Sequence, residues 1–582
     1  MSSRTPKRIS NEEPHKKLDP REVKYRARDS QRTSSYESQY EYQNDSQYQT
    51  REMYRDDREI EEDISYSDHY DDVRAYSRKK SGPSTGRKVI GKILLYLQLA
   101  ASVVVFILLL RFQILSAKKL LVIGGALLVI WLIIFISQRK KFNKIQAAGM
   151  VISILLSIVL VVGSLYLVRT NQMLKQVTSG KSYDISLYDV VVRTEDAAQA
   201  IEDTGGYRFA IQPNFRQADL QSVISQLEEE LGGEIQIVEV DSVIGEAEAL
   251  MAGDVEAAIY NDVFNATILE QYEDYESYAR VLKTYTVRTE AETVQAVDVD
   301  VSSDAFLILI SGNDSEGEVS LTGRSDVDIV AGINTTSKEV LLITIPRDYY
   351  VEFPGITAAG SRDKLTHAGI YGMEALISTV ENLIGYKINY YVRLNFSSMM
   401  NIVDAMGGVT IYNEQDFISH GGIHFPEGML DLNGDYALHY VRERYAFEDG
   451  DFARGRNQIK VIQAMMDKLV SVNTLANYNN LMTAISESLA TNIPTEDLMK
   501  IVNIQLNENP QWHVVSYQML GAIMFQPCQS ANGAFLSVDM PYKEAVDNVS
   551  VLLGQLYGGE VLSEDLQLSD NGLLTYITQP VG

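Results

Sequence analysis

Residues 305–348 read AFLILISGNDSEGEVSLTGRSDVDIVAGINTTSKEVLLITIPRD. The first seven, AFLILIS (305–311), form a continuous apolar run of strand length, which is typical of a strand buried on both faces of a sheet. Two further runs, VDIVAGIN (327–334) and EVLLITI (339–345), flank the polar turn TTSK and predict a β-hairpin. The stretch therefore predicts the centre of a buried β-sheet.

Two helical patterns follow this stretch. GMEALISTVENLIG (372–385) has apolar residues at helical spacing, and Gly385 is the kind of residue that commonly ends a helix. SSMMNIVDAMGG (397–408) predicts a second helix. Its N-cap is expected at Ser397 or Ser398, because a serine hydroxyl can accept a hydrogen bond from the first free backbone amides.

Strand patterns alternate with these helices. NYYVRLNF (389–396) predicts a strand, and WHVVSYQML (512–520) predicts a later strand that completes the sheet. Such alternation is typical of an α/β fold in which a central mixed β-sheet is flanked by helices. We expect this α/β domain to span residues 302–582, with its core motifs within 305–470.

Charged and amide side chains lie at the ends of the predicted elements of this domain. They are Asp314, Arg324, Asp326, Arg347, Asp348, Arg442, Arg444, Asp451, Arg454, Arg456 and Gln458. Arginine presents a planar fork of donors that matches phosphate oxygens, whereas lysine offers only a point charge. Residues 301–470 hold eight arginines and five lysines inside a strongly acidic region. The pattern indicates an anion site, with phosphate as the favoured anion.

Two pairs within this set extend the prediction. We expect Arg442 and Arg444 to lie on a strand, where alternate residues point to one face, and so to reach a single pocket together. Asp314 and Asp326 would lie beside the phosphate, and Mg²⁺ takes one or two carboxylates together with phosphate oxygens. The residues alone leave an alternative open, in which the arginines form surface ion pairs that each contribute about 0–1 kcal/mol.

Three apolar runs precede this domain, at residues 93–110, 120–137 and 147–168, within the segment 87–168. Because a hydrocarbon core requires about 20 helical residues, these runs predict three transmembrane helices. Ten Lys and Arg residues flank the runs on one side and six on the other. The positive-inside rule then predicts a multi-pass cell-membrane protein with a cytoplasmic N-terminus and extracellular C-terminal domains. A buried core hairpin is the alternative.

The segments on either side of the spans differ in character. Residues 1–86 hold 17 basic and 18 acidic residues with almost no aliphatic ones, which predicts a disordered cytoplasmic tail. Residues 183–295 alternate short strand and helix patterns and predict a small α/β accessory domain. Within them, EDYESYAR (273–280) and the polar stretch after it have the composition of a linker.

Charge and cysteine content exclude several classes of function. The net charge of −27 divides into +9 over residues 1–168 and −36 over 169–582, so the larger part lacks the clustered positive charge that nucleic acid requires. The N-terminal part has no helix-turn-helix pattern. Cys528 is the single cysteine of the chain, which excludes an intramolecular disulfide framework and a Cys-rich zinc site. No nucleic-acid partner is expected.

Seven motifs of the α/β domain occur in a recognisable order and spacing. They are SGNDS (311–315), GRSD (323–326), IPRDYYV (345–351), DKLTHAGIYG (363–372), MGGVTI (406–411), LDLNGDYALHYVRER (430–444) and DFARGRNQ (451–458). In these motifs the chain resembles the LytR-CpsA-Psr (LCP) family of Gram-positive bacteria, from about residue 303 to 470 and more loosely to about 555. The three spans and the accessory domain further resemble the capsule-associated streptococcal-type members, although the tyrosine-rich tail is longer.

The resemblance implies a Mg²⁺-dependent phosphotransferase or glycopolymer ligase anchored in the membrane. It would move a capsular or secondary wall polysaccharide from undecaprenyl pyrophosphate to peptidoglycan, with the capsule-biosynthesis machinery as a further partner. Attack by an acceptor sugar hydroxyl at the anomeric carbon of the polymer would expel the lipid pyrophosphate, and no general base is assigned.

By motif, Asp314 and Asp326 would hold Mg²⁺ in such an enzyme. The pyrophosphate ligands would be Arg324, Arg347, Lys364, Arg442, Arg444, Arg454 and Gln458. Of these, Arg324, Arg347, Arg442 and Arg444 would act in catalysis together with Asp326. One departure concerns Arg456, because this chain has Asn457 where the family often has an arginine before the glutamine.

Two other functions remain open from the sequence. One is a membrane sensor or regulator of polysaccharide biosynthesis, since members of the family have been labelled transcriptional attenuators. The other is a hydrolase that only cleaves polyprenyl pyrophosphate. A requirement for a sugar acceptor would separate the transferase from the hydrolase.

Overall fold

The computed structural model describes residues 85–112, 115–139, 143–179, 183–291, 294–315, 317–358, 360–469, 478–569 and 575–576. The predicted disordered tail, residues 1–86, lies outside the described residues except for its last two positions.

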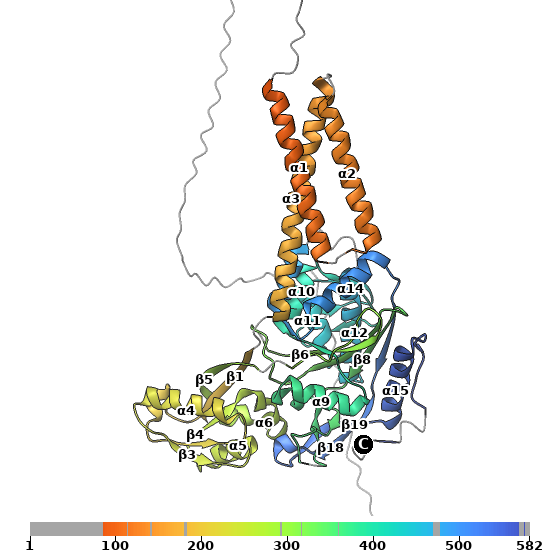
Figure 1. Ribbon diagram of the computed structural model, residues 1–582. Helices are drawn as coiled ribbons and strands as arrows, with labels where there is room; N and C mark the ends of the chain where they lie inside the picture. The colour runs from red at the N-terminus through yellow and green to blue at the C-terminus, as the bar shows by residue number, and fades with distance from the viewer. Residues whose placement is uncertain are drawn as a thin grey trace, which may run out of the picture. The chain divides into compact units, whose positions relative to one another are not determined.

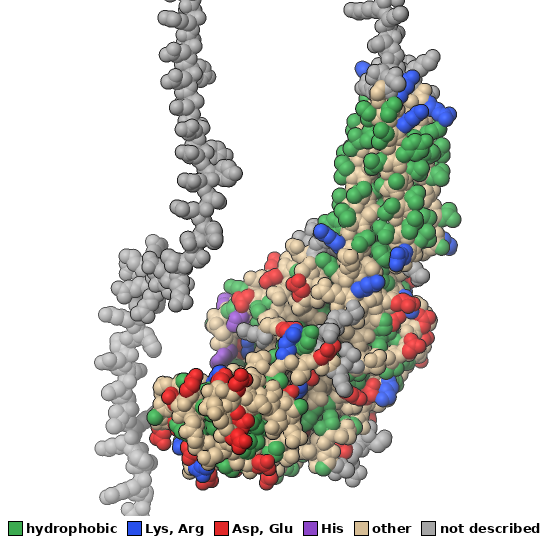
Figure 2. Space-filling model, turned by 60° about the vertical axis from the view of Figure 1, so that its left-hand side comes forward, with side chains coloured by type: hydrophobic (Ala, Val, Ile, Leu, Met, Phe, Trp, Pro, Cys, Tyr) green, Lys and Arg blue, Asp and Glu red, His purple; other side chains and the backbone are tan. Residues whose placement is uncertain are grey.

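Three long apolar helices follow, as predicted. They are α1 (Thr85–Arg111), α2 (Ala117–Arg139) and α3 (Asn143–Ser179). Each contains a segment long and apolar enough to cross a membrane, with mean hydropathies of 2.7, 2.9 and 2.7. Figure 2 shows an almost continuous hydrophobic surface over these helices, with Lys and Arg at its two ends. The helix α3 continues 11 residues beyond the predicted run, to Ser179.

The accessory part is a five-stranded sheet with helices on both faces. Its strand order is β3-β2-β4-β1-β5. The strands are β1 (Tyr183–Arg193), β2 (Arg208–Ile211), β3 (Gln236–Glu239), β4 (Ala257–Asn261) and β5 (Ala279–Glu290). The helices are η1 (Ile201–Thr204), α4 (Gln217–Leu231), α5 (Val243–Ala252), η2 (Asp262–Phe264), α6 (Asn265–Gln271) and α7 (Tyr275–Tyr278). The apolar sides of α4 and α5 pack into two different cores, one on each face of the sheet.

The expectation of a linker at 273–280 is wrong. This segment forms α7 and the start of β5, and β5 pairs antiparallel with β1 along its whole length. The polar residues that suggested a linker lie on the exposed side of the strand, whereas Ala279, Tyr285 and Val287 are buried. An edge strand with one exposed face contains many polar residues, so its composition can resemble that of a linker.

The larger domain is built on a six-stranded mixed sheet, as predicted, with the order β16-β11-β6-β7-β8-β17. The strands are β6 (Ala305–Asn313), β7 (Val327–Asn334), β8 (Glu339–Ile345), β11 (Tyr390–Asn395), β16 (Leu489–Thr491) and β17 (His513–Gln518). The predicted hairpin is confirmed, because β7 pairs antiparallel with β8. The later strand β17 pairs parallel with β8, so the carboxyl ends of these two strands meet at one edge.

Helices cover both faces of this sheet (Figure 1). On one face, α9 (Met373–Ile384) and α15 (Lys543–Gly558) pack on a core that includes Leu307, Val330 and Leu341. On the other face, α12 (Asp451–Leu469) packs on Ile329 and Leu342. Successive side chains of each strand point alternately into one core and the other. Both faces of the strand are therefore buried, which explains the continuous apolar runs in the sequence.

Two predicted helix ends can be compared with the structure. Gly385 closes α9 in the left-handed conformation, as expected. The N-cap of α10 (Phe396–Ala405) is Asn395 rather than Ser397 or Ser398. The Asn395 carboxamide oxygen accepts the bond from the Ser398 amide at 2.9 Å, so the N-cap lies two or three residues earlier than the serines suggest.

The remaining short elements surround this sheet. The strands are β9 (Tyr350–Val351), β10 (Asp363–Lys364), β12 (Val409–Asn413), β13 (Phe417–Ile418), β14 (His424–Phe425), β15 (Gly428–Leu432), β18 (Gly521–Pro527) and β19 (Phe535–Pro541). The helices are α8 (Leu365–Ala368), η3 (Gly369–Tyr371), α11 (Gly434–Arg442), α13 (Tyr478–Ser488), α14 (Thr495–Glu508) and η5 (Gln529–Ala531).

One apolar core joins the accessory and larger parts. It combines Phe264 and Ile268 of the accessory part with Leu536 and Val538 of β19 and with the buried Cys528. Burial raises the pKa of the Cys528 thiol, so this cysteine is an inert member of the core. The two parts are therefore packed together rather than only linked by the chain.

Gly369 allows a close backbone contact that positions the GRSD motif. A β-carbon at this position would lie 2.5 Å from the Gly323 carbonyl oxygen and 3.1 Å from the Ser325 amide nitrogen. The Gly323 amide also donates to the Gly369 carbonyl at 3.1 Å. Any side chain at 369 therefore pushes directly on the loop that carries Arg324.

We predict that Gly369→Ala lowers the free energy of unfolding by about 1–3 kcal/mol, the usual cost of overpacking against atoms that cannot move away. Gly205→Ala is the matched control, because Gly205 has a φ of −57° and open space around its α-carbon. Thermal unfolding of the full chain in detergent measures both variants. Equal midpoints for the two would contradict the tight contact at Gly369.

Candidate functional site

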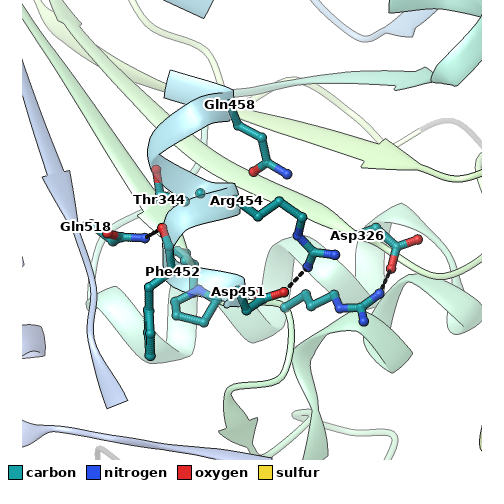
Figure 3. A pocket seen from close by; sticks show the side chains of 11 residues that line it. Asp326, Thr344, Asp451, Phe452, Arg454, Gln458 and Gln518 are labelled. Atoms are coloured by element: carbon teal, nitrogen blue, oxygen red, sulfur yellow. Dashed lines mark hydrogen bonds and ion pairs between the residues drawn. The ribbon is translucent and has the colours of Figure 1, made fainter. Parts of the chain in front are cut away.

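A pocket lies where β8 and β17 end. Its walls come from the start of β7, the carboxyl ends of β8 and β17, and the first two turns of α12. They are Asp326, Thr344, Ile345, Pro346, Arg347, Asp451, Phe452, Arg454, Gly455, Gln458 and Gln518. Figure 3 shows Arg454 and Gln458 extending from α12 over the pocket toward Asp326. Four of the sequence-predicted site residues, Asp326, Arg347, Arg454 and Gln458, are therefore brought together.

The helix α12 approaches these strands closely because of Gly455. A β-carbon there would lie 2.7 Å from the Gln518 amide nitrogen and 3.1 Å from a methyl carbon of Thr344. The Gln518 amide donates to the Phe452 carbonyl oxygen at 2.6 Å and ties β17 to the first turn of the helix. The N-terminal end of α12, where the helix dipole is positive, is thus fixed against the pocket.

Asp326 and Arg347 form the floor of the pocket. The Arg347 Nη1 donates to Asp326 Oδ1 at 2.6 Å, and the Asp326 side chain is 8% exposed. Burial raises the pKa of Asp326, but the positive charges of Arg324, Arg347 and Arg454 outweigh it, and the net shift is downward. Asp326 is therefore a carboxylate at neutral pH.

Four buried polar atoms of the pocket walls make no hydrogen bond with the described residues. They are Asp326 Oδ2, Thr344 Oγ1, Arg347 Nε and Asp451 Oδ1, and the last two lie within ion-pair distance of Asp348 and Arg454. A buried polar atom without a partner costs about 1–3 kcal/mol, so its persistence requires an explanation. One carboxylate oxygen, one hydroxyl and one guanidinium donor that converge on the same pocket are suited to a polar ligand.

Arg454 is the second arginine of the pocket. Its Nη2 lies 2.5 Å from Asp451 Oδ1 within the first turn of α12. Burial lowers the pKa of Arg454, and the nearby positive charge of Arg347 lowers it further. The two guanidinium groups repel each other across the pocket, and an anion bound between them would relieve that repulsion.

Arg324 and Asp314 pair with each other beside this pocket. Arg324 Nη2 lies 3.3 Å from Asp314 Oδ2, and the Asp314 side chain is half exposed. Arg324 is not among the pocket-lining residues, yet its charge acts on Asp326. Arg324 therefore interacts electrostatically with both predicted Mg²⁺ ligands, through an ion pair with Asp314 and a Coulombic effect on Asp326.

A buried arginine that the sequence prediction missed supports the GRSD loop. Arg393, on β11, has no exposed surface and donates to the carbonyl oxygens of Gly323 at 2.9 Å and Arg324 at 3.3 Å. It also donates to the Ser311 hydroxyl. Burial lowers the pKa of Arg393 to about 10, even though the carboxylate of Asp328 opposes the shift. The signal available in the sequence was one arginine inside the apolar strand NYYVRLNF.

Other predicted site residues lie elsewhere. Lys364 donates to Glu270 of the accessory part at 2.6 and 2.7 Å and is almost fully buried. Arg442 and Arg444 do not share a strand, which corrects that expectation: Arg442 is the last residue of α11 and Arg444 follows it. The spacing of the two arginines in LHYVRER suggested a strand. The segment instead ends a helix, because Asn433 caps the helix N-terminus and the buried residues follow helical spacing.

The contacts of these two arginines differ from the predicted phosphate contacts. Arg442 stacks over the Phe396 ring at 4.4 Å. Arg444 donates to the Tyr445 hydroxyl at 2.6 Å and lies 4.7 Å from the centre of that ring. Neither is among the pocket-lining residues.

Asp326 has one carboxylate oxygen available at the predicted magnesium site. Asp326 Oδ2 is a buried carboxylate oxygen without a hydrogen-bond partner in the described chain, which fits a metal ligand. The described residues hold no group of three or more His, Cys, Asp or Glu side chains placed for a metal. Asp326 Oδ2 could serve as one protein ligand of an ion such as Mg²⁺, which takes one or two carboxylates together with phosphate oxygens and water.

Sequence reasoning also missed the contributions of Thr344 and Gln518. Both are ordinary polar residues at the ends of β8 and β17, and only the parallel pairing of those strands brings them to the pocket. Taken together, the side chains of the pocket can accept a hydrogen bond at one carboxylate and can donate several hydrogen bonds to an anion. Such a set of groups is suited to hold a phosphorylated ligand.

The chain was compared with known families and relatives. Residues 271–538 match the model described as the LytR_cpsA_psr family. The polyisoprenyl-teichoic acid–peptidoglycan teichoic acid transferase TagU of Enterococcus faecalis is 37% identical over 203 residues, which cover 34% of this chain and 65% of that protein. The chain thus spans slightly less than two thirds of the length of this relative.

The chain is also similar to a second curated relative and to a solved structure. TagU of Bacillus cereus (strain ATCC 14579) is 34% identical over 232 residues, which cover 39% of this chain and 74% of that protein. The crystal structure of B. subtilis TagV has a TM-score of 0.37 and 25% sequence identity, and the match covers 44% of this chain and 98% of that one. On the family match and the extent of the B. cereus similarity, the chain belongs to the LytR_cpsA_psr family.

Proposed function

We propose that the chain is a membrane-anchored transferase that moves a glycopolymer from polyprenyl pyrophosphate to peptidoglycan. The names of its teichoic acid transferase relatives support the class of donor and acceptor. The proposed polymer is a capsular or secondary wall polysaccharide, and the proposed carrier is undecaprenyl pyrophosphate.

The observation that carries the proposal is that Asp326 Oδ2, Thr344 Oγ1 and Arg347 Nε belong to residues that line one pocket, are buried, and make no hydrogen bond within the described chain. Arg347 Nε and the Thr344 hydroxyl can donate to pyrophosphate oxygens, while Asp326 Oδ2 would be a ligand for a metal ion. Arg454 and Gln458 add donors from the opposite wall. A donor anion of two phosphates is matched by groups on both sides of the pocket.

The proposed reaction is phosphotransfer, in place of the attack at the anomeric carbon that the resemblance implied. The acceptor hydroxyl oxygen attacks the phosphorus that carries the glycan and forms a new P–O bond. The P–O bond to the lipid phosphate breaks, and the lipid leaves as a monophosphate with the bonding electron pair. The acceptor proton passes to solvent or a base that is not assigned. Arg347 and Arg454 stabilise the charge that develops on the phosphate oxygens.

Mg²⁺ is proposed as the cofactor, with Asp326 and Asp314 as its protein ligands. When bound, the ion neutralises phosphate charge and acts as a Lewis acid. Asp326, kept ionised by its neighbouring arginines, is in the protonation state that a metal ligand requires. Asp314 pairs with Arg324, which lies two positions before Asp326 in the chain.

The orientation of the chain in the membrane is part of the proposal. The excess of Lys and Arg beside one end of the apolar helices favours a cytoplasmic N-terminus. The accessory and catalytic parts would then face the extracellular side, where peptidoglycan is found.

We predict that Arg454→Ala lowers the transfer rate by about 100-fold or more, the usual effect of removing one group that stabilises charge in a transition state. Arg456→Ala is the matched control on the same helix, because Arg456 is half exposed and pairs with Asp449. The assay uses the full chain, a short polyprenyl-pyrophosphate glycan and peptidoglycan fragments, with mass spectrometry of the product. Equal losses in both variants would contradict the assigned pocket.

The same assay separates the competing reactions. A product that retains phosphorus in the new linkage supports phosphotransfer, whereas a product without phosphorus supports attack at the anomeric carbon. Cleavage of the donor without any acceptor product would indicate a pyrophosphate hydrolase. Lipid binding without turnover would favour the sensor.

We predict that a chelator abolishes transfer and that added Mg²⁺ restores it. Asp326→Asn should require a Mg²⁺ concentration about tenfold or more above that of the unmodified chain, because it removes an anionic ligand. Asp539→Asn is the control, since Asp539 is also buried but lies outside the pocket-lining set. Full activity in the presence of the chelator would rule out the metal.

The proposed orientation predicts which positions a membrane-impermeant maleimide can reach in intact cells. Cys528 is buried, so the background should be low. Asp565→Cys, at an exposed position, should be labelled, and Ser10→Cys should be labelled only after the cells are lysed. The reverse pattern would place the N-terminus outside.

A further inference from the structure

Lys364 is held by the accessory part of the chain. Its Nζ lies 2.6 and 2.7 Å from the two carboxylate oxygens of Glu270, and its side chain is 7% exposed. Leaving such an ammonium unpaired in the interior would be costly, so Glu270 is the main compensation for its burial. Glu270 lies one residue before the first residue that matches the family model.

Glu270 is itself fixed by the catalytic domain. The backbone amide of Ser537, on β19, donates to Glu270 Oε1 at 3.0 Å. The helix α6, which carries Glu270, contributes Ile268 to the apolar core shared with Leu536 and Val538. The carboxylate therefore has one position relative to β19 and Lys364.

A series of ion pairs leads from Glu270 to the pocket. Lys364 Nζ lies 3.8 Å from Asp348 Oδ1, and Asp348 Oδ2 lies 3.7 Å from Arg347 Nε. Arg347 then donates to Asp326 at 2.6 Å. Charges alternate along this series, so each side chain is attracted to both of its neighbours.

The backbone reinforces the same connection. Lys364 pairs with Tyr350 in the short sheet of β9 and β10. The Thr366 amide donates to the Arg347 carbonyl oxygen at 2.8 Å. The segment that carries Lys364 therefore holds the segment that carries Arg347.

We propose that Glu270 is a positioning residue for the phosphate pocket, supplied by the accessory part and acting through Lys364 and Asp348 on Arg347. The inference rests on the proposed function of the pocket as a pyrophosphate site. It assigns Lys364 a structural role in this chain instead of direct contact with pyrophosphate.

The expected effect follows from the two longer ion pairs. Without Glu270, the ammonium of Lys364 has Asp348 as its remaining carboxylate partner in the series and draws it closer. Asp348 then moves away from Arg347, and the guanidinium that faces the pocket loses one of the two carboxylates that orient it. Pyrophosphate should bind more weakly to a less well-oriented arginine.

The test measures binding of inorganic pyrophosphate, with Mg²⁺ present, to the full chain in lipid nanodiscs by calorimetry. Glu270→Gln should weaken pyrophosphate binding by about fivefold or more. The measurement is made at a temperature below that at which the variant unfolds. Glu273→Gln is the matched control, because Glu273 is exposed on the same surface. Unchanged or tighter binding in Glu270→Gln would overturn the inference.

Two further variants separate positioning from a loss of stability. Glu270→Gln combined with Lys364→Met leaves no unpaired buried charge and no ammonium to draw Asp348 away from Arg347, so it should fold and should bind pyrophosphate more tightly than Glu270→Gln alone; binding as weak as that of Glu270→Gln would overturn the inference. Glu270→Gln combined with Arg347→Ala should bind no more weakly than Arg347→Ala alone, because both changes act on one group. Fully additive losses would show that Glu270 acts by another route.

Failure of the proposed function gives a different result. If the unmodified chain binds no pyrophosphate, the pocket assignment fails and the role of Glu270 fails with it. If the unmodified chain binds pyrophosphate and Glu270→Gln binds it equally well, only the inference about Glu270 is wrong.

Discussion

The buried guanidinium of Arg393 is the contact on which the site depends. It lies on β11, the second strand from one edge of the mixed sheet, has no exposed surface, and donates to two consecutive carbonyl oxygens of the GRSD loop. A charge taken so fully out of water is tolerated only when its donors are satisfied and an opposite charge is near. Asp326 and Asp328 are the nearby acidic groups, and Asp328 accepts from the Ser325 hydroxyl at 2.7 Å. Burial raises the pKa of Asp328 to about 7, whereas the pKa of Asp326 is lowered by its neighbouring arginines. The loop therefore presents Arg324 and Asp326 in one arrangement.

Much of the fold could be predicted from the sequence because its signals are local. The apolar runs of β6, β7 and β8, the polar turn between them and the glycine that closes α9 are all properties of adjacent residues. The three apolar helices were predictable for the same reason, since length and composition suffice. Four residues of the pocket, Asp326, Arg347, Arg454 and Gln458, were also predicted, because motif order preserves which element ends meet.

The rest depended on contacts between distant segments. Arg442 and Arg444 are spaced like alternate strand residues, but Arg442 ends the helix α11, which is set by its cap and by packing against α10. The polar segment before residue 290 forms a strand only because β1 lies beside it. Lys364 belongs to a family motif, yet its partner Glu270 is 94 positions away and outside the matched region. A contact between side chains so far apart in the chain leaves no periodic pattern in the sequence from which it could be predicted.

The shared apolar core has a consequence for how this protein can change during evolution. Domains that are joined by exposed linkers are readily exchanged between proteins, because few contacts cross the boundary. Here Phe264 and Ile268 lie in the same core as Leu536 and Val538, so a substitution on one side alters the packing of the other. The two parts are expected to diverge together as one inherited unit, and a transplanted accessory part would require compensating changes in the β18–β19 hairpin of its new host.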